Sequence, residues 1–251
     1  MIRLRKKQVE KIKDLLKREY INVVTPLKHE NAFQLLIATI LSAQTLDDTV
    51  NKVTRKLFQY FPTVEVLAKA SFDEVDKIIN IINYHRTKAK NIIDLASKIL
   101  EKYDGHVPYK IEDLVQLPGV GRKTANVVIS EWFSKPLSCR GNRFDICINK
   151  PFNFTQNVFV DPGSISQHDS IYIEPQGFVV DTHVKRVAIR LGLSDSEKVE
   201  NIEKDLMSIF PKSEWPEMSL RLIFHGRYKC KAKVNMCKND KNWASLCIYG
   251  I

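Results

Sequence analysis

One short segment combines residue types that could do chemistry. Residues 117–125 read L-P-G-V-G-R-K-T-A, so Gly119 and Gly121 frame a tight turn and Lys123 follows closely. Glycine lets a backbone bend sharply and approach a ligand. The N–H groups at a helix start bind anions, because they carry the positive end of the helix dipole. Such a turn can hold a DNA phosphate without reading a base, and a neutral lysine amine can attack a carbon electrophile to form a Schiff base. Alone, however, the segment could equally be an ordinary turn before a helix.

The composition is typical of a globular protein with an anionic partner. The chain has 251 residues, of which 44% are hydrophobic, enough for one large domain or two small ones. Its net charge of +10 and pI of about 9.3 favour a polyanion, although a merely basic surface would give the same values.

The chain shows no sign of membrane insertion or secretion. No apolar run approaches the roughly 20 residues of a membrane span. Residues 1–20 carry three acidic residues and apolar residues at helical spacing, which predicts a surface helix rather than a targeting peptide. We therefore expect no membrane partner and a cytoplasmic or nucleoid location, or a nuclear one in a eukaryote.

Helical periodicity runs through nearly the whole chain. Apolar residues recur at spacings of three and four in about ten segments, among them residues 33–41, 50–58 and 184–191. Ser71 and Glu74 have the spacing of a capping box at a helix start. Because short polar connections join these segments, we expect an all-α fold.

Residues 134–174 break this pattern. They contain several prolines and glycines, and the alternating pieces 157–160 and 170–173 suggest a hairpin. A connection of this length without helices is unusual in a compact domain. We expect a small β excursion or a disordered insert here.

Four segments, in their order along the chain, resemble endonuclease III, a family of helix-hairpin-helix DNA glycosylases and abasic-site lyases. They are L-S-A-Q-T at 41–45, L-P-G-V-G-R-K-T-A at 117–125, V-D-T-H-V at 180–184 and H-G-R-Y-K-C at 225–230. The resemblance covers most of residues 31–237 apart from the insert. It implies a two-domain all-α fold that binds DNA in the cleft between its domains. The six-helix domain with the hairpin would span 24–133, and residues 1–23 with 175–251 would form the second helical domain.

The resemblance also assigns catalytic roles. Lys123 would attack the sugar C1′, displace the damaged base and form the Schiff base for strand cleavage. Asp181 would be the catalytic carboxylate, which supports positive charge on the sugar and helps the lysine lose its proton. Asp181 also stands where a helix beginning at Thr182 needs an N-cap, and the two roles are compatible.

Other residues would bind the DNA. Chemistry on a stacked base requires flipping its nucleotide out of the duplex. By resemblance Gln44 would fill the gap, and Tyr84 would be a wedge where the family usually has leucine or phenylalanine. His183 and His225 are more typical of hydrogen-bonding structural histidines than of acids or bases. The remaining DNA-binding candidates are Leu117, Gly119, Val120, Gly121, Arg122, His183 and Arg227.

The cysteines depart from the family pattern. Most members hold a [4Fe–4S] cluster through C-x6-C-x2-C-x5-C. Here Cys230 and Cys237 keep the first spacing, Asp240 stands at the third position, and Cys247 comes one residue late. A cubane cluster normally takes four thiolates, so the residues favour three reduced thiols over an intact cluster. The other two of the five cysteines lie in the insert and match no family role, and five in a chain of this length do not indicate a disulfide scaffold.

The resemblance implies excision of oxidised pyrimidines from duplex DNA, followed by β-elimination at the abasic site, by a protein that acts as a monomer. A purine-lesion (8-oxoguanine-type) glycosylase-lyase shares the lysine and aspartate but fits L-S-A-Q-T and the H-G-R-Y ending poorly. An adenine-mismatch glycosylase would lack the lysine at position 123. A decayed enzyme that binds DNA without turnover stays open.

Overall fold

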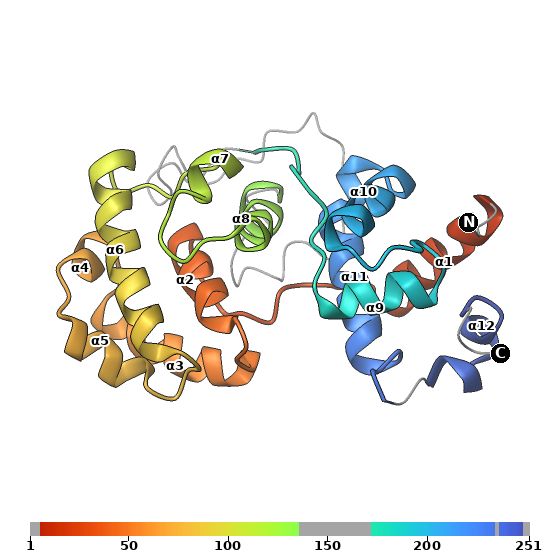
Figure 1. Ribbon diagram of the computed structural model, residues 1–251, viewed down its shortest axis with the longest axis horizontal. Helices are drawn as coiled ribbons and strands as arrows, with labels where there is room; N and C mark the ends of the chain where they lie inside the picture. The colour runs from red at the N-terminus through yellow and green to blue at the C-terminus, as the bar shows by residue number, and fades with distance from the viewer. Residues whose placement is uncertain (1–5, 136–171, 234–235, 248–251) are drawn as a thin grey trace. The chain divides into compact units, whose positions relative to one another are not determined.

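The computed structural model describes residues 6–135, 172–233 and 236–247. Within these ranges the chain forms helices, loops and turns and no strand, so the all-α prediction is confirmed (Figure 1). No helix in the same ranges is long and apolar enough to cross a membrane. Most of the expected β or disordered insert lies outside the described residues.

The chain divides into two compact units. Residues 26–173, here called the hairpin unit, form the first. Residues 1–25 together with 174–251, here called the split unit, form the second. Each is described by itself.

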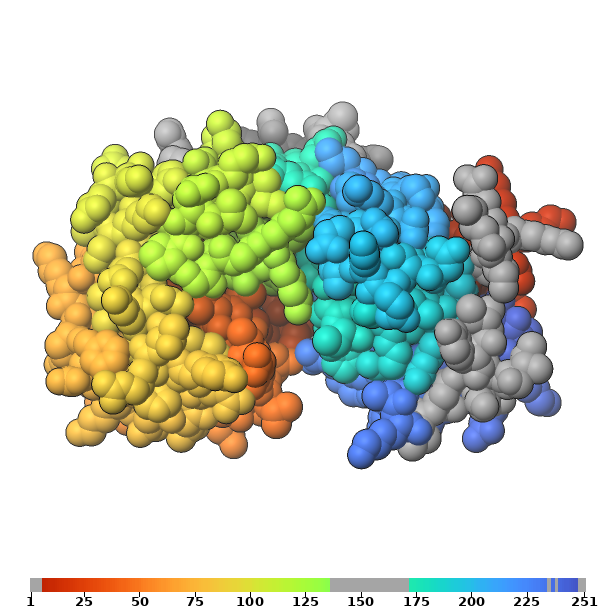
Figure 2. All heavy atoms as spheres, in the orientation of Figure 1, coloured from red at the N-terminus to blue at the C-terminus, as the bar shows by residue number. Residues whose placement is uncertain are grey.

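The hairpin unit is built around α2 (Ala32–Ser42), whose residues are nearly all buried. Neighbouring helices α3, α6 and α8 pack against α2, while α4 and α5 pack against α6. On one face, the side chains of α3 to α6 form a continuous surface, orange to yellow in Figure 2. The other helices of this unit are α3 (Asp47–Tyr60), α4 (Val64–Ala68), α5 (Phe72–Ile79), α6 (His85–Tyr103), α7 (Ile111–Leu114) and α8 (Arg122–Val128).

Side-chain caps fix several helix starts in this unit. Asn31 caps α2 by accepting from the N–H of Gln34. Ser71 and Glu74 form the predicted capping box of α5, each side chain accepting from the other's backbone N–H. Such caps satisfy N–H groups that have no partner within the helix.

The split unit joins the N-terminal helix α1 (Lys6–Glu19) to the C-terminal part of the chain. Ile12, Leu15 and Leu16 are the buried face of α1, as the spacing predicts, and α1 packs on α11. The core of this unit includes the three C-terminal cysteines. The other helices are α9 (Thr182–Arg190), α10 (Val199–Ile209), α11 (Trp215–Tyr228) and α12 (Lys241–Ala244), with 3-10 turns at Lys212–Glu214 and Met236–Asn239.

Candidate active site and cysteine cluster

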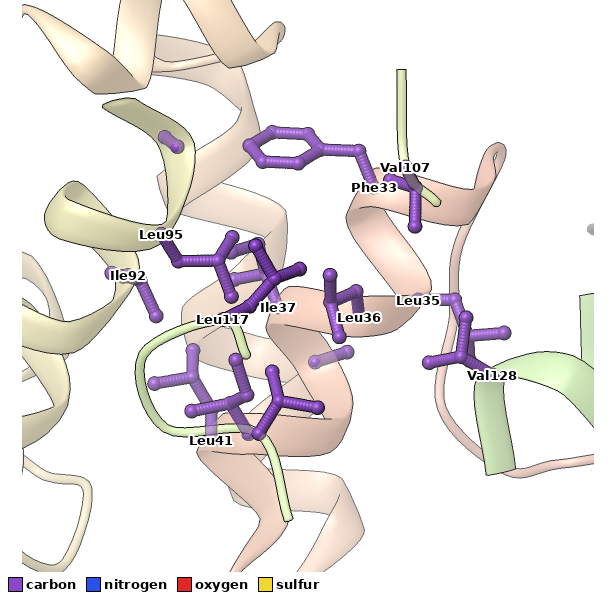
Figure 3. Close-up of a cluster of buried hydrophobic side chains, with 14 of the residues drawn as sticks. Phe33, Leu35, Leu36, Ile37, Leu41, Ile92, Leu95, Val107, Leu117 and Val128 are labelled. Carbon is purple, nitrogen blue, oxygen red and sulfur yellow. The ribbon is translucent and has the colours of Figure 1, made fainter. Parts of the chain in front are cut away.

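The turn before α8 has buried apolar side chains on one side and exposed residues on the other. Leu117 and Val120 are only 2% and 7% exposed, and Leu117 points into a cluster with residues of α2 and α6 (Figure 3). Their side chains therefore hold the turn to the core, and only their backbone could contact DNA. Gly119 has φ +76°, and a Cβ there would lie 3.1 Å from the side-chain nitrogen of Asn91. The backbone conformation at position 119 thus favours glycine, and a side chain there would also crowd Asn91.

Gly121 and Lys123 form the exposed part of this turn. Gly121 is the N-cap of α8, has no side chain to cap the helix, and would meet nothing within 4 Å if it carried a Cβ. Arg122 and Lys123 are the first two residues of α8, and both are exposed. The helix continues directly into a π-helical turn at Ile129–Phe133. Lys123 is therefore an exposed residue in the first turn of α8, and the start of a helix suits an anionic substrate.

Two residues with left-handed backbone lie in adjacent loops of the hairpin unit. Gln44 has φ 58° and Tyr84 has φ 59°, values that non-glycine residues rarely adopt without compensating contacts. Both side chains are exposed. Asn83 joins the loops, because its side-chain amide donates to the carbonyl oxygen of Gln44 and its backbone N–H to Thr45 Oγ1 at 3.4 Å. The structure thus brings together the two residues predicted to enter the DNA.

A buried lysine, which the sequence reasoning missed, fixes the same loop. Lys88 is 7% exposed, and its Nζ donates to the carbonyl oxygens of Leu41 at 2.9 Å and Ala43 at 2.6 Å. Burial lowers the pKa of Lys88. The available signal was its position four residues before Ile92, on the apolar stripe of α6.

In the split unit, Asp181 is the N-cap of α9. Its Oδ1 accepts from the N–H of Val184 at 2.7 Å, and the second carboxylate oxygen takes no part in this cap. His183 is half-buried; burial lowers its pKa, Asp181 opposes that effect, and Arg186 and Arg227 add to it. This ring is therefore favoured in its neutral form.

Arg186 connects the start of α9 to the end of α11. Its Nη2 donates to the carbonyl oxygen of Gly226 at 2.8 Å and lies 3.2 Å from His183 Nδ1, while Nε donates to the carbonyl oxygen of Cys230 at 3.0 Å. The helices meet closely, since a Cβ on Gly226 would lie 2.9 Å from His183 Cβ. Arg227 is half-buried near the end of α11. The V-D-T-H and H-G-R-Y segments therefore form one packed element.

The three C-terminal cysteines are buried in the core of the split unit. Cys230 and Cys237 are fully buried, and Cys247 is 2% exposed. His225, Cys230 and Cys237 offer three ligand atoms within 4.8 Å of one another, a group that could hold a metal ion. We call these three residues the cysteine cluster. Cys139 and Cys147 lie outside the described residues.

The predicted site residues thus divide between the units. The hairpin unit carries Lys123, its turn, Gln44 and Tyr84, whereas the split unit carries Asp181, His183, Arg227 and the cysteine cluster. An all-α chain with a glycine hairpin feeding a lysine-bearing helix, and a second helix capped by aspartate, defines a helix-hairpin-helix repair protein. Consistent with this, residues 37–212 match the model of the HhH-GPD superfamily of base excision DNA repair proteins.

Known proteins place the chain more narrowly. It is 36% identical to endonuclease III of Synechocystis over 97% of this chain and 93% of that protein. It is 37% identical to endonuclease III of Bacillus subtilis over 92% of this chain and 88% of that protein. A solved structure of a trapped endonuclease III–DNA covalent intermediate superposes with a TM-score of 0.78 at 35% identity, covering 99% of this chain and 98% of that one.

The chain belongs to the endonuclease III family. It is accordingly a base excision repair enzyme, a DNA glycosylase with abasic-site lyase activity.

Proposed function

We propose that the enzyme excises oxidised pyrimidines from duplex DNA and then cleaves the abasic site, using Lys123 as nucleophile and Asp181 as catalytic carboxylate. The observation that carries the proposal is the exposed Lys123 at the second position of α8, immediately after a turn whose apolar residues are buried. The related protein solved as a covalent intermediate with DNA supports a nucleophilic mechanism.

The chemistry comprises excision of the base followed by cleavage of the strand. The Lys123 amine, in its neutral form, attacks the sugar C1′ as the bond from C1′ to the base nitrogen breaks, and the base leaves with the electron pair. The Asp181 carboxylate stabilises the positive charge that develops on the sugar. Ring opening then gives a Schiff base between Nζ and C1′. Loss of a proton from C2′ expels the 3′-phosphate by β-elimination, and hydrolysis of the imine returns the free lysine.

The other site residues prepare the substrate. A base must leave the stack before C1′ can be attacked. Gln44 fills the vacated space and Tyr84 wedges the duplex open, because both are exposed on loops that Asn83 fastens together. The N–H groups around Gly121 hold a phosphate, and Arg122, His183 and Arg227 add contacts to the DNA backbone. The enzyme acts as a single chain.

Borohydride trapping tests this proposal. The full chain is mixed with a duplex carrying one thymine glycol and reduced, which converts a Schiff base into a stable adduct. We expect an adduct with the parent chain and with Lys56→Ala, which removes an exposed lysine from α3, and none with Lys123→Ala.

Trapping on different substrates shows which part of the proposal is wrong if the expected adduct does not form. An adduct only on an abasic duplex would retain the lyase and overturn the pyrimidine assignment. Preferential reaction with an 8-oxoguanine duplex would favour the purine-lesion alternative. Binding without an adduct on any substrate would indicate a DNA-binding protein that has lost catalysis.

A further inference from the structure

The [4Fe–4S] cluster implied by the family does not fit the residues of this chain. Such a cluster normally takes four thiolates, each bonded to a different iron. The third position is Asp240, and its carboxylate is already engaged in this structure. Oδ2 accepts from Lys229 Nζ at 2.6 Å, and Oδ1 accepts from the N–H of Asn242 at 2.9 Å as the N-cap of α12. Asp240 therefore serves as a structural cap rather than as an iron ligand.

The cysteine cluster presents a different set of donors. His225 Nε2 lies 3.3 Å from Cys237 Sγ, and the ligand atoms of His225, Cys230 and Cys237 all lie within 4.8 Å of one another. Ligands of one tetrahedral zinc ion, bonded at about 2.3 Å, are spaced by about 3.8 Å. Ligands of a cubane are spread more widely, since each binds a separate iron. The spacing thus suits a single ion.

Neighbouring side chains contact these donor residues in the way that hydrogen-bonding partners usually contact the ligands of a metal ion. The Tyr20 hydroxyl lies 3.2 Å from His225 Nδ1, so Nε2 is the ring nitrogen that faces the cysteines. Arg190 Nη1 donates to Cys230 Sγ at 3.4 Å, which offsets negative charge on the sulfur. Metal-binding histidines usually have such a partner on their second nitrogen, which fixes the ring.

A fourth donor comes from the same core. Cys247 follows α12, is 2% exposed, and packs in the core that contains Cys230 and Cys237. Its sulfur is not part of the group of ligand atoms that lie within 4.8 Å of one another, so the C-terminal segment has to bring it closer when the ion binds. Its one-residue shift from the family spacing, which counts against a cluster, does not exclude it from a different site.

We propose that the split unit binds one zinc ion through His225 Nε2 and the sulfurs of Cys230, Cys237 and Cys247. Three cysteines and one histidine are a common ligand set of structural zinc. The ion joins the end of α11 to the C-terminal segment and stabilises the fold of that segment. This inference is independent of the proposed roles of Lys123 and Asp181.

Metal analysis of the full chain tests the proposal directly. The chain is expressed with zinc and iron both supplied, purified without oxygen, and analysed for zinc, iron and acid-labile sulfide. We expect about one zinc per chain and neither iron nor sulfide. After replacement by cobalt, we expect the visible bands of tetrahedral cobalt with thiolate ligands. Four irons with sulfide would overturn the proposal, as would a folded chain that binds no zinc.

Variants assign the ligands. Cys237→Ser and Cys247→Ser should each weaken zinc binding in competition with a chromophoric chelator by roughly tenfold or more, and Tyr20→Phe by about tenfold through the loss of the outer contact. Asp240→Asn is the matched control, because it retains the cap but removes the ion pair, and its zinc content should stay unchanged. Loss of zinc in Asp240→Asn with retention in Cys247→Ser would overturn the proposed ligand set. If a cysteine variant fails to fold, the metal content and cobalt spectrum of the parent chain still decide.

Discussion

The side-chain amide of Asn83 donates to the backbone carbonyl oxygen of Gln44 across 39 residues of sequence. This contact joins the loop of Gln44 to the loop of Tyr84, the two residues with left-handed backbone that we propose enter the DNA. Because a left-handed conformation is costly for such residues, contacts must hold it. The preparation of these loops before DNA binds is therefore a property of the hairpin unit itself.

Lys88→Met should loosen the Gln44 loop without unfolding the unit. The change removes the donor to the carbonyl oxygens of Leu41 and Ala43, but it also removes a buried charge, and these effects partly cancel. We expect the free energy of unfolding to change by less than about 1 kcal/mol, and single-turnover base excision to fall by about tenfold, which corresponds to about 1.4 kcal/mol. Hydrogen exchange at residues 42–46 should become faster.

A matched control is Lys90→Met, which removes an exposed lysine from the same helix. It should leave both exchange and excision unchanged. Equal effects of the two substitutions would show that Lys88 acts only through net charge.

Features that depend on the spacing of nearby residues could be predicted from the sequence. The capping box of Ser71 and Glu74 and the buried face of α1 could be found because three- and four-residue spacings determine which side chains meet on a helix. Lys88 and Ala43 are 45 residues apart, and no local sequence pattern predicts the hydrogen bond between them.

The same limit applies to the cysteine cluster. Cys230, Cys237 and Cys247 were candidate ligands because the resemblance to the family gave their spacing a role, whereas His225 was expected to be more typical of a hydrogen-bonding structural histidine than of an acid or base. Its place beside both cysteines depends on how the end of α11 packs against the following segment. The catalytic roles of Lys123 and Asp181 stay predictions that only chemistry can test.

Gly121→Ala should separate DNA binding from folding. A Cβ at this position meets nothing within 4 Å, and φ −91° is accessible to alanine, so stability should change by less than about 1 kcal/mol. The added methyl group would stand where we propose that a phosphate contacts the backbone. We expect affinity for an abasic duplex to fall about tenfold, measured by fluorescence anisotropy at fixed salt.

Gly119→Ala is the contrasting variant. Its φ of +76° and the 3.1 Å approach to Asn91 predict a loss of stability as well as of binding. If Gly121→Ala instead bound DNA like the parent chain, the phosphate contact at this turn would be wrong.

His29 should make the hairpin unit sensitive to acid. It is 5% exposed and lies 2.7 Å from the carbonyl oxygen of Leu27, to which Nδ1–H donates. Burial lowers its pKa below 6.5; the Leu27 contact and Glu131 oppose this, and Lys135 adds to it. The stability that the neutral ring provides is present above about pH 6.5 and is lost as pH falls through the lower pKa of the folded state.

Urea unfolding at a series of pH values measures this effect. In His29→Asn, the asparagine amide can donate to the same carbonyl oxygen. Below pH 6.5 the free energy of unfolding of this variant should fall less steeply with decreasing pH than that of the parent chain. The difference in slope should correspond to the uptake of up to about one proton on unfolding. Parallel profiles for the two chains would mean that His29 titrates alike in the folded and unfolded states.

Asp181 caps α9, and two substitutions can separate this cap from the catalytic role that we propose for its carboxylate. Asp181→Asn keeps an oxygen to accept from the N–H of Val184, so the cap of α9 and the stability should be retained. Asp181→Ala loses the cap and should cost about 1 kcal/mol in unfolding by urea. If the carboxylate charge acts in catalysis, both variants should lower single-turnover excision by about a hundredfold or more while affinity for duplex DNA is unchanged. An Asp181→Asn chain that excises at the parental rate would leave Asp181 as a helix cap only, and the carboxylate that assists Lys123 would have to be sought elsewhere.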